Sequence, residues 1–276
     1  SGKSLKVQQL GGYVAEHTNY HHGEGNLYDT IVKLANEFPG TNNIPLLYRD
    51  GMFGTRLEGG KDAASPRYIF TKMECLTPLI YRSEDDTLLE KVIDDGDEVE
   101  PKFYVPILPM ILVNGCTAGI GTGWSCNVPC YNPIDMIDAI NIWLDNDGDV
   151  LIKEGKTVVS LFPEFKPWYR GFTGEIKKDT KNTFITTGNF EKKKGKKDTY
   201  IINELPIGKW TNKFKEDCED FIENKKLKSI KNYSTPTKVQ FVITESTNGF
   251  KCNLKNLKLT SKLYTSNIVL FDDNEK

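Results

Sequence analysis

The chain has 276 residues, which is enough for one large domain or two modest domains with real cores. Its hydrophobic content of 38% and aromatic content of 11% are typical of a soluble globular protein. No stretch is long and apolar enough to span a bilayer, so we expect no membrane association. The six cysteines are scattered and no apolar signal region precedes them, so we expect reduced thiols in a cytosolic or nuclear protein.

The net charge of −2 conceals an asymmetry between the two halves of the chain. Residues 1–150 hold 11 Lys and Arg against 22 Asp and Glu, whereas the remainder holds 25 against 16. Much of the acid lies in residues 84–100. The near-neutral total therefore does not exclude a nucleic-acid partner, but it requires this acidic segment to face away from any phosphate backbone.

The first predicted helix covers roughly residues 24–38, where apolar side chains repeat at helical spacing before Pro39 and Gly40 end the pattern. Short β-prone segments follow at residues 46–48 and 68–71, joined by glycine-rich turns. A helix, a turn, a second helix and a small sheet with long loops are what a winged-helix domain would show in sequence.

A second helix is predicted to begin at Asn132, which can cap it, with Pro133 at its first position. The predicted apolar face of this helix comprises Ile134, Ile137, Ile140 and Trp143.

Strands dominate the prediction for the rest of the chain, with one helix near residues 212–224. The predicted strands are residues 158–162, 174–176, 184–187, 200–202 and 238–244. The whole pattern indicates an α+β fold, and composition alone places a domain boundary near residue 150. The lysine-rich run at residues 192–197 is most simply a solvated hairpin tip, although a DNA-facing role stays open.

The most informative segment is residues 59–68, a loop of glycines and small residues that ends in Arg67 and Tyr68. A phenol can form a covalent intermediate if it is deprotonated and the developing charges are held, and Arg67 offers a fixed positive charge for that purpose. The simpler interpretation of Tyr68 is a half-buried strand tyrosine behind ordinary turn residues.

This segment is one of a series of runs that resemble the DNA breakage-reunion region of type IIA DNA topoisomerases. The resemblance is to the eukaryotic type and its relatives in large DNA viruses. The matching runs follow one another in order along nearly the whole chain: residues 20–24, 54–56, 59–71, 99–101, 106–109, 119–124, 167–172, 204–206 and 269–271. The resemblance implies a winged-helix domain with the catalytic tyrosine over residues 1–105, followed by a mixed α/β tower domain over residues 106–276.

The resemblance also implies residue roles. Tyr68 would form a transient 5′-phosphotyrosyl link with DNA, Arg67 would contact the scissile phosphate, and His22 would lie close to that phosphate. The residues expected to contact DNA are His21, Lys6, Arg56, Lys61 and Ile120. For the two histidines, a turn with exposed polar rings before a helix is the open alternative.

Ile120 lies between glycines, which would let its side chain protrude from the backbone. In the resembled family this isoleucine wedges between base pairs and bends the duplex, at a cost of about 1–10 kcal/mol. The preceding segment, residues 114–119, is one residue longer than is usual in that family.

The resemblance further implies an ATP-dependent enzyme that passes one duplex through another. Mg²⁺ and ATP would be bound by domains absent from this chain, and no metal site is predicted within it. The expected partners are double-stranded DNA and a second copy of the enzyme, in the nucleus or in a cytoplasmic viral factory. We expect the chain alone to bind DNA weakly and to cleave it negligibly. The alternative is a DNA-binding and bending module without catalysis; a self-standing nuclease would need its own carboxylate cluster.

Overall fold

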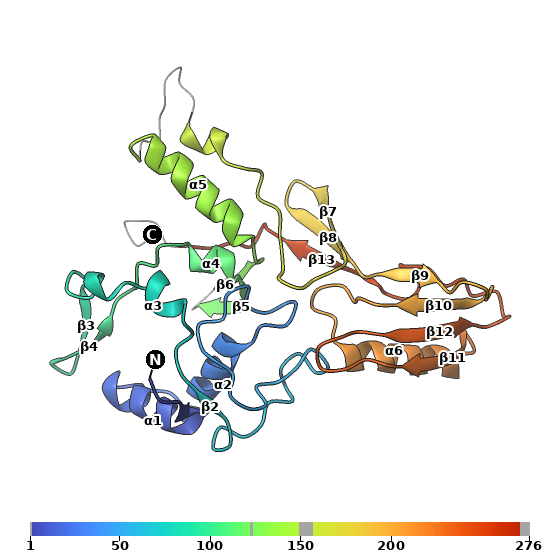
Figure 1. Cartoon of the computed structure of the whole chain (residues 1–276), viewed down its shortest axis with the longest axis horizontal. Helices are drawn as coiled ribbons and strands as arrows, with labels where there is room; N and C mark the ends of the chain where they lie inside the picture. The colour runs from blue at the N-terminus through green and yellow to red at the C-terminus, as the bar shows by residue number, and fades with distance from the viewer. Residues whose placement is uncertain (1, 122–123, 149–156, 271–276) are drawn as a thin grey trace.

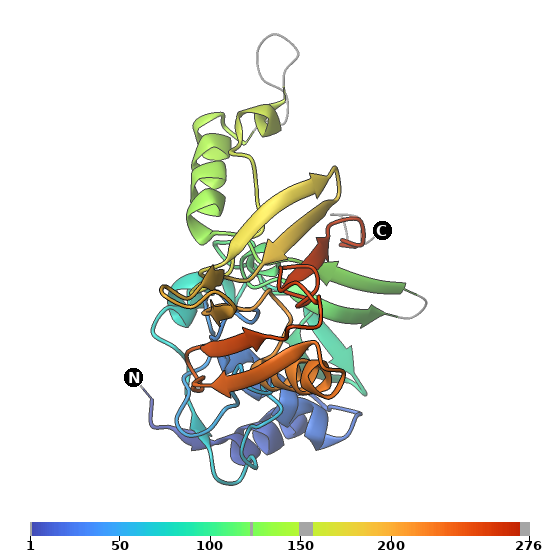
Figure 2. The same cartoon turned by 90° about the vertical axis from the view of Figure 1, so that its right-hand side faces the viewer.

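The computed structural model describes residues 2–121, 124–148 and 157–270, and it combines α-helices with small antiparallel sheets (Figures 1 and 2). The helices are α1 (Val7–His17), α2 (Glu24–Ala35), α3 (Thr77–Ile80), α4 (Met110–Val113), α5 (Pro133–Asp145) and α6 (Thr211–Glu223), with 3₁₀ turns η1 (Ser83–Asp85) and η3 (Val158–Leu161). The strands of the first half are β1 (Leu5–Lys6), β2 (Phe70–Thr71), β3 (Lys91–Asp94), β4 (Asp97–Pro101), β5 (Cys116–Gly121) and β6 (Trp124–Val128). Those of the second half are β7 (Glu175–Thr180), β8 (Thr183–Thr187), β9 (Phe190–Lys192), β10 (Thr199–Ile202), β11 (Leu227–Asn232), β12 (Phe241–Glu245) and β13 (Thr260–Tyr264). Among the described helices, none is long and apolar enough to cross a membrane.

Helices α1 and α2 pack together against the short β1–β2 ladder. Gly11 permits this close approach, because a Cβ there would lie only 2.5 Å from the ring of Tyr28. Val7, Ile31 and Ile69 are buried in the small core that these elements share. The helix predicted over residues 24–38 is present as α2 but ends three residues earlier.

The acidic segment forms the β3–β4 hairpin, which extends from the body of the molecule (Figure 1). Asp95 and Gly96 turn the chain with φ of 49° and 93°, the backbone that a tight two-residue hairpin turn requires. This hairpin has no large hydrophobic core of its own, and Ile93 is 62% exposed.

Helix α5 begins as predicted, because the Asn132 side chain accepts a hydrogen bond from the Ile134 N–H at 3.0 Å. Its predicted apolar face was wrong. The buried residues are Met136 and Ala139, whereas Ile134, Ile137 and Trp143 are exposed. The strand predicted over residues 158–162 was also wrong, since Val158–Leu161 form the 3₁₀ turn η3 next to α5.

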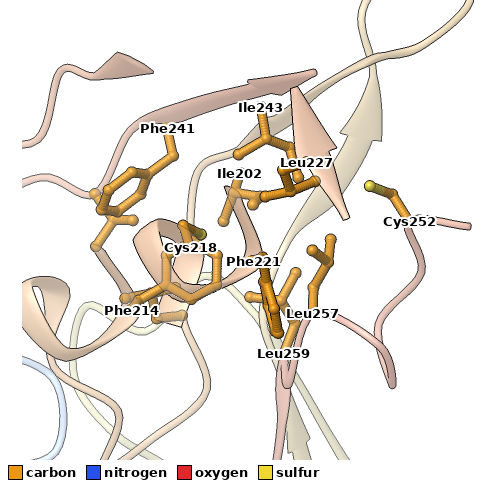
Figure 3. Packing of buried hydrophobic residues seen from close by; sticks show 12 residues of the cluster. Ile202, Phe214, Cys218, Phe221, Leu227, Phe241, Ile243, Cys252, Leu257 and Leu259 are labelled. Carbon is orange, nitrogen blue, oxygen red and sulfur yellow. The ribbon is translucent and has the colours of Figure 1, made fainter. Parts of the chain in front are cut away.

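Two sheets are found in the described part of the second half. The larger has the strand order β11-β12-β10-β9, and α6 covers one of its faces (Figure 1). Aromatic and aliphatic side chains from α6 and the strands interdigitate in a core that includes Phe214, Phe241 and Ile243 (Figure 3). The smaller sheet has the order β13-β8-β7. The lysine-rich run lies between the paired strands β9 and β10, so the predicted hairpin is confirmed.

One buried amide holds several segments together. The Asn43 side chain is 2% exposed, and its Nδ2 lies 2.9, 2.9 and 3.1 Å from the carbonyl oxygens of Val113, Tyr131 and Trp168. Its Oδ1 accepts a hydrogen bond of 2.8 Å from the Arg170 N–H. Because these partners are distant in sequence, Asn43 fixes the first half of the chain against the second.

Candidate functional site

Tyr68 lies on an exposed turn immediately before β2. Its side chain is 69% exposed, and its N–H donates to the Ser65 carbonyl at 2.9 Å, which closes the turn. The Arg67 guanidinium lies 5.4 Å from the centre of the Tyr68 ring, and Arg67 Nε donates to Ser65 Oγ at 3.3 Å. Tyr68 is therefore not a half-buried strand residue. It is an exposed residue whose ring lies beside a permanent positive charge.

The start of α1 holds this turn in place. The Val7 N–H donates to the Ile69 carbonyl at 3.0 Å, and the Gln8 N–H donates to the Pro66 carbonyl at 3.1 Å. These are first-turn amides of α1, which have no partner within their own helix. The bonds fix the backbone on both sides of Tyr68, so the tyrosine stands on a rigid support.

Lys6 lies next to this segment. It pairs with Phe70 in the β1–β2 ladder and its side chain is exposed. A cleft of about 340 Å³ opens beside Arg67 and is lined by Gln8, Tyr28, Ser65, Pro66 and Arg67. The structure thus places Lys6, Arg67 and Tyr68 in one neighbourhood.

Residues 54–62 form a closed loop that leads to this turn. The Asp62 carboxylate accepts hydrogen bonds from the Thr55 N–H at 2.8 Å and the Thr55 hydroxyl at 2.6 Å. Gly54 and Gly60 meet so closely that a Cβ on Gly54 would lie 2.5 Å from the Gly60 oxygen. Lys61 lies on this loop with an exposed side chain.

Arg56 is on the same loop but lies inside the protein. Its side chain is 7% exposed, and Arg56 Nη2 lies 2.5 Å from Oε1 of Glu204, whose side chain is 3% exposed. A buried and paired guanidinium is not available to a phosphate backbone. The predicted DNA contact of Arg56 would require this ion pair to open.

The two histidines lie between α1 and α2, and both are exposed. His21 Nε2 lies 3.1 Å from Asp94 Oδ2 of the acidic hairpin, while the His22 ring packs edge-on against Tyr20 at 5.4 Å between ring centres. The end of strand β3 in the acidic segment therefore lies beside His21, one of the residues predicted to contact DNA. In the described residues, no hydrogen bond or ring contact joins His22 to Arg67 or Tyr68.

Ile120 belongs to a separate element, the β5–β6 hairpin, and its side chain is 88% exposed. Cys116 pairs with Val128 and Gly119 pairs with Cys126, so β5 advances three residues while β6 advances two. A β-bulge therefore absorbs one extra residue within residues 114–119. The bulge keeps the pairing of Ile120 with Ser125 near the end of the hairpin.

A basic groove lies on the four-stranded sheet, lined by lysines and by outward-facing strand residues. Its volume is about 640 Å³, and its lining includes Lys193, Lys196, Lys228, Lys231 and Tyr233. The side chains that alternate with the strand residues of this groove fill the core under α6. The lysine-rich hairpin tip thus contributes to a wider positive surface.

The described residues contain no group of three or more His, Cys, Asp or Glu side chains that could hold a metal ion. The groups around Tyr68 are cationic or neutral rather than carboxylates. They do not fit Mg²⁺, whose ligands are oxygens, usually from carboxylates and water.

Comparison with known proteins agrees with this arrangement. The family described as the A subunit of DNA gyrase/topoisomerase IV matches the chain over residues 1–276. The chain belongs to this family of DNA topoisomerases.

Individual relatives are DNA topoisomerases 2. The chain is 44% identical over 279 residues to DNA topoisomerase 2 of Invertebrate iridescent virus 6, a match covering 100% of this chain and 23% of the viral protein. It is 41% identical over 285 residues to DNA topoisomerase 2 of Drosophila melanogaster, covering 99% of this chain and 19% of that protein. The chain therefore spans about a fifth of the length of these relatives.

A solved structure is also similar. It is the Plasmodium falciparum topoisomerase II DNA-binding, cleavage and re-ligation domain, with a TM-score of 0.88 and 38% sequence identity. The match covers 99% of this chain and 36% of the solved chain.

Sequence reasoning missed three residues that organise the site. Glu204 is within a run used for the resemblance, yet nothing nearby in sequence indicates that it pairs with Arg56, 148 residues away. The contact of Asp94 with His21 could not be predicted, because Asp94 is one of many acidic residues in the segment 84–100. Asp62 carried the clearest available signal, since an aspartate in a glycine-rich loop commonly accepts hydrogen bonds from nearby backbone.

Proposed function

We propose that this chain is the DNA-binding and cleavage portion of an ATP-dependent type II DNA topoisomerase, with Tyr68 as the nucleophile. The observation that carries the proposal is the exposed Tyr68 side chain, whose ring lies beside Arg67 on a turn held by α1. The similarity to a solved DNA-binding, cleavage and re-ligation domain supports it.

In the proposed reaction, Tyr68 Oη attacks the scissile phosphorus in line with the bond to the 3′ oxygen. The bond between phosphorus and Oη forms as the bond between phosphorus and the 3′ oxygen breaks. The phenolic proton passes to water, and the departing 3′ oxygen takes up a proton from water to become a 3′-hydroxyl, so the protons balance. One phosphodiester has replaced another, so the reverse attack by the 3′-hydroxyl reseals the strand without a further energy source.

The chain's own residues would hold charge and geometry during this exchange. Arg67 would donate to the nonbridging oxygens, where negative charge is concentrated in the transition state. His22 would donate to the same phosphate, and His21, Lys6 and Lys61 would contact neighbouring phosphates. The basic groove would bind a more distant part of the duplex.

Ile120 would bend the duplex by entering a base step. Its exposure near the end of a paired hairpin supports this role, because an aliphatic side chain gains little from lying in water. The bulge supports it as well, since it takes up one residue of β5 while Ile120 remains paired with Ser125.

We further propose that residues 1–105 form a winged-helix domain and residues 106–276 a tower domain. Two copies would act together, each cleaving one strand of the same duplex. Mg²⁺ and ATP, which the family generally uses, would be bound by parts of the protein other than this chain. The eukaryotic and viral relatives support action in the nucleus or in a viral factory.

Covalent trapping tests the proposal. The natural protein at its full length is incubated with duplex DNA and Mg²⁺, denatured rapidly and separated on a denaturing gel. We expect a protein–DNA adduct in the wild type that Tyr68→Phe abolishes. Tyr13→Phe is the matched control, because Tyr13 is also exposed, at 59%, but stacks on His17 in α1. DNA binding without any adduct would instead favour a non-catalytic bending module.

A further inference from the structure

We propose that Arg56 and Glu204 are positioning residues that hold Tyr68 for attack by locking the loop of residues 54–62 onto the sheet unit formed by α6 and β9–β12. This inference rests on the proposed function of Tyr68. It replaces a direct DNA contact of Arg56 with an indirect role.

The Glu204 carboxylate is fully used in this lock. Its Oε1 accepts from Arg56 Nη2 at 2.5 Å and from the Leu205 N–H at 2.8 Å. Its Oε2 accepts from the Thr173 N–H and hydroxyl, both at 3.2 Å. Because four donors bind the Glu204 carboxylate, it is held in one orientation. This orientation in turn fixes the position of the Arg56 guanidinium.

The backbone of the loop is held by the start of α6. The Thr211 N–H donates to the Arg56 carbonyl at 3.2 Å, and the Asn212 N–H donates to the Leu57 carbonyl at 3.0 Å. The Asn212 side chain also donates to the Glu58 carboxylate. The loop thus supplies acceptors to first-turn amides of α6, and Glu58 places a negative charge at the positive end of the helix.

Close packing completes the attachment. The Trp210 ring lies against Gly59, where φ is 65° and a Cβ would lie 2.3 Å from the indole. Trp210 also packs edge-on against Phe38 at 5.7 Å between ring centres. Only glycine fits under the indole at position 59, so this close packing of the loop tip against Trp210 depends on glycine.

The base of the loop is tied to the segment that carries Tyr68. The Ala64 N–H donates to the Met52 carbonyl at 2.9 Å, and Asp50 and Phe70 exchange two backbone hydrogen bonds of 2.9 and 3.1 Å. A displacement of α6 or of the loop tip is therefore passed to the backbone next to Tyr68. A reacting atom misplaced by about 1 Å can slow a reaction about 10²-fold.

The experiment measures cleavage separately from binding. With the natural protein at its full length, the single-turnover rate constant for covalent-complex formation is measured at saturating DNA with Mg²⁺, and the DNA dissociation constant is measured without Mg²⁺. We expect Glu204→Ala to slow cleavage about 10²-fold while DNA affinity is unchanged. Glu204→Gln, which retains an oxygen to accept from Arg56, recovers part of the rate.

Two further variants control for the possibility that a slower cleavage rate reflects only a loss of folding. Asn212→Ala removes the exposed contact with Glu58 and leaves the buried Glu204 carboxylate in place. This variant therefore tests the positioning role if the Glu204 variants do not fold. Its expected rate lies between those of Glu204→Ala and the wild type. Ile243→Ala removes a fully buried side chain from the core of the same sheet unit without changing the lock, and is expected to lower stability but not the cleavage rate.

The outcomes are distinct. Cleavage at the wild-type rate in folded Glu204→Ala, or in Asn212→Ala if the former does not fold, overturns the positioning role. An equal loss in Ile243→Ala also overturns it, because general destabilisation would then explain the effect. If the wild-type protein forms no adduct on Tyr68, it is the proposed function that fails.

Discussion

Asp94 Oδ2 lies 3.1 Å from His21 Nε2, so a carboxylate of the acidic hairpin is bound to the histidine next to His22. The pair joins residues 73 positions apart and is largely exposed on the histidine side, at 73%. A DNA phosphate that approached His21 would meet this carboxylate first. In the proposed DNA complex, Asp94 would compete with DNA for the same imidazole, and the β3–β4 hairpin in this position would repel the phosphate backbone.

We predict that Asp94→Asn tightens DNA binding. The expected gain is about two- to fivefold at low salt, the size of one exposed ion-pair interaction, and it shrinks as salt is added. Fluorescence anisotropy with a labelled duplex over a range of salt concentrations measures it. Asp97→Asn is the control, because it removes one charge from the same hairpin on β4 without a contact to His21. An equal gain in both variants would attribute the effect to net charge alone.

A second prediction concerns Ile120. Because its side chain is 88% exposed, Ile120→Ala should leave the thermal unfolding temperature unchanged. The same change should reduce the bend of bound DNA, since alanine is too short to enter a base step. Energy transfer between dyes at the two duplex ends reports the bend. Ile93→Ala, at 62% exposure on the acidic hairpin, provides the comparison. Bending that survives in Ile120→Ala would remove this residue from the proposal.

The third prediction is a pH dependence of stability at Asp217. Burial acts to raise the pKa of this carboxyl, but hydrogen bonds from Lys209 at 2.7 Å and Lys258 at 3.1 Å outweigh burial and lower the pKa below its ordinary value of 3.8. As pH falls, the unfolded chain takes up the proton before the folded one. The stabilisation is therefore complete above about pH 4 and is lost below it.

Urea unfolding at several pH values measures the contribution of the ionised Asp217 carboxylate to the free energy of unfolding. Asp217→Asn should cost about 1.5–3 kcal/mol at neutral pH, the value of hydrogen bonds to a charged group, and the difference from the wild type should shrink toward pH 2. Asp179→Asn, which removes an exposed 3.7 Å pair with Lys262, should change stability by less than about 1 kcal/mol. A cost for Asp217→Asn that stays constant down to pH 2 would contradict the assignment.

A fourth prediction uses the cysteines. Burial raises the pKa of the thiols of Cys130, Cys218 and Cys252 to about 12, whereas Cys75 is exposed. At pH 8 a thiol with that pKa is thiolate in only about one molecule in 10⁴, so it reacts slowly with alkylating reagents. Iodoacetamide should label Cys75 in the native protein and the other three only in denaturant, as read by mass spectrometry. Rapid native labelling of Cys130 would contradict the packing described here.

Local sequence signals predicted local structure well. The cap at Asn132, the start of α2 and the β9–β10 hairpin all depend on residues within a few positions of one another. The prediction of secondary structure was wrong where tertiary packing determines the local conformation. Val158 and Val159 suggested a strand by their branching, yet they belong to a 3₁₀ turn against α5.

The site shows the same division. The sequence alone shows Arg67 next to Tyr68 at the end of a motif. The structure adds the hydrogen bonds by which the start of α1 supports their turn. The pairing of Arg56 with Glu204 could not be found, because 148 residues separate the two and the sequence does not show which charges are buried. A positive residue in a DNA-binding protein suggests a phosphate contact by default. The structure adds that Arg56 is buried and paired with Glu204, which is the basis for the positioning role proposed for it.

The most direct test of the account is the mass of the DNA-linked peptide. The adduct is trapped with the natural protein, the DNA is digested to a short nucleotide remnant, and the protein is cut with trypsin. We predict that the remnant is attached through its 5′-phosphate to the peptide of residues 68–72, which contains Tyr68 as its only tyrosine. A remnant on any other peptide, or one attached through a 3′-phosphate, would contradict the assignment of Tyr68 as the residue that cleaves DNA.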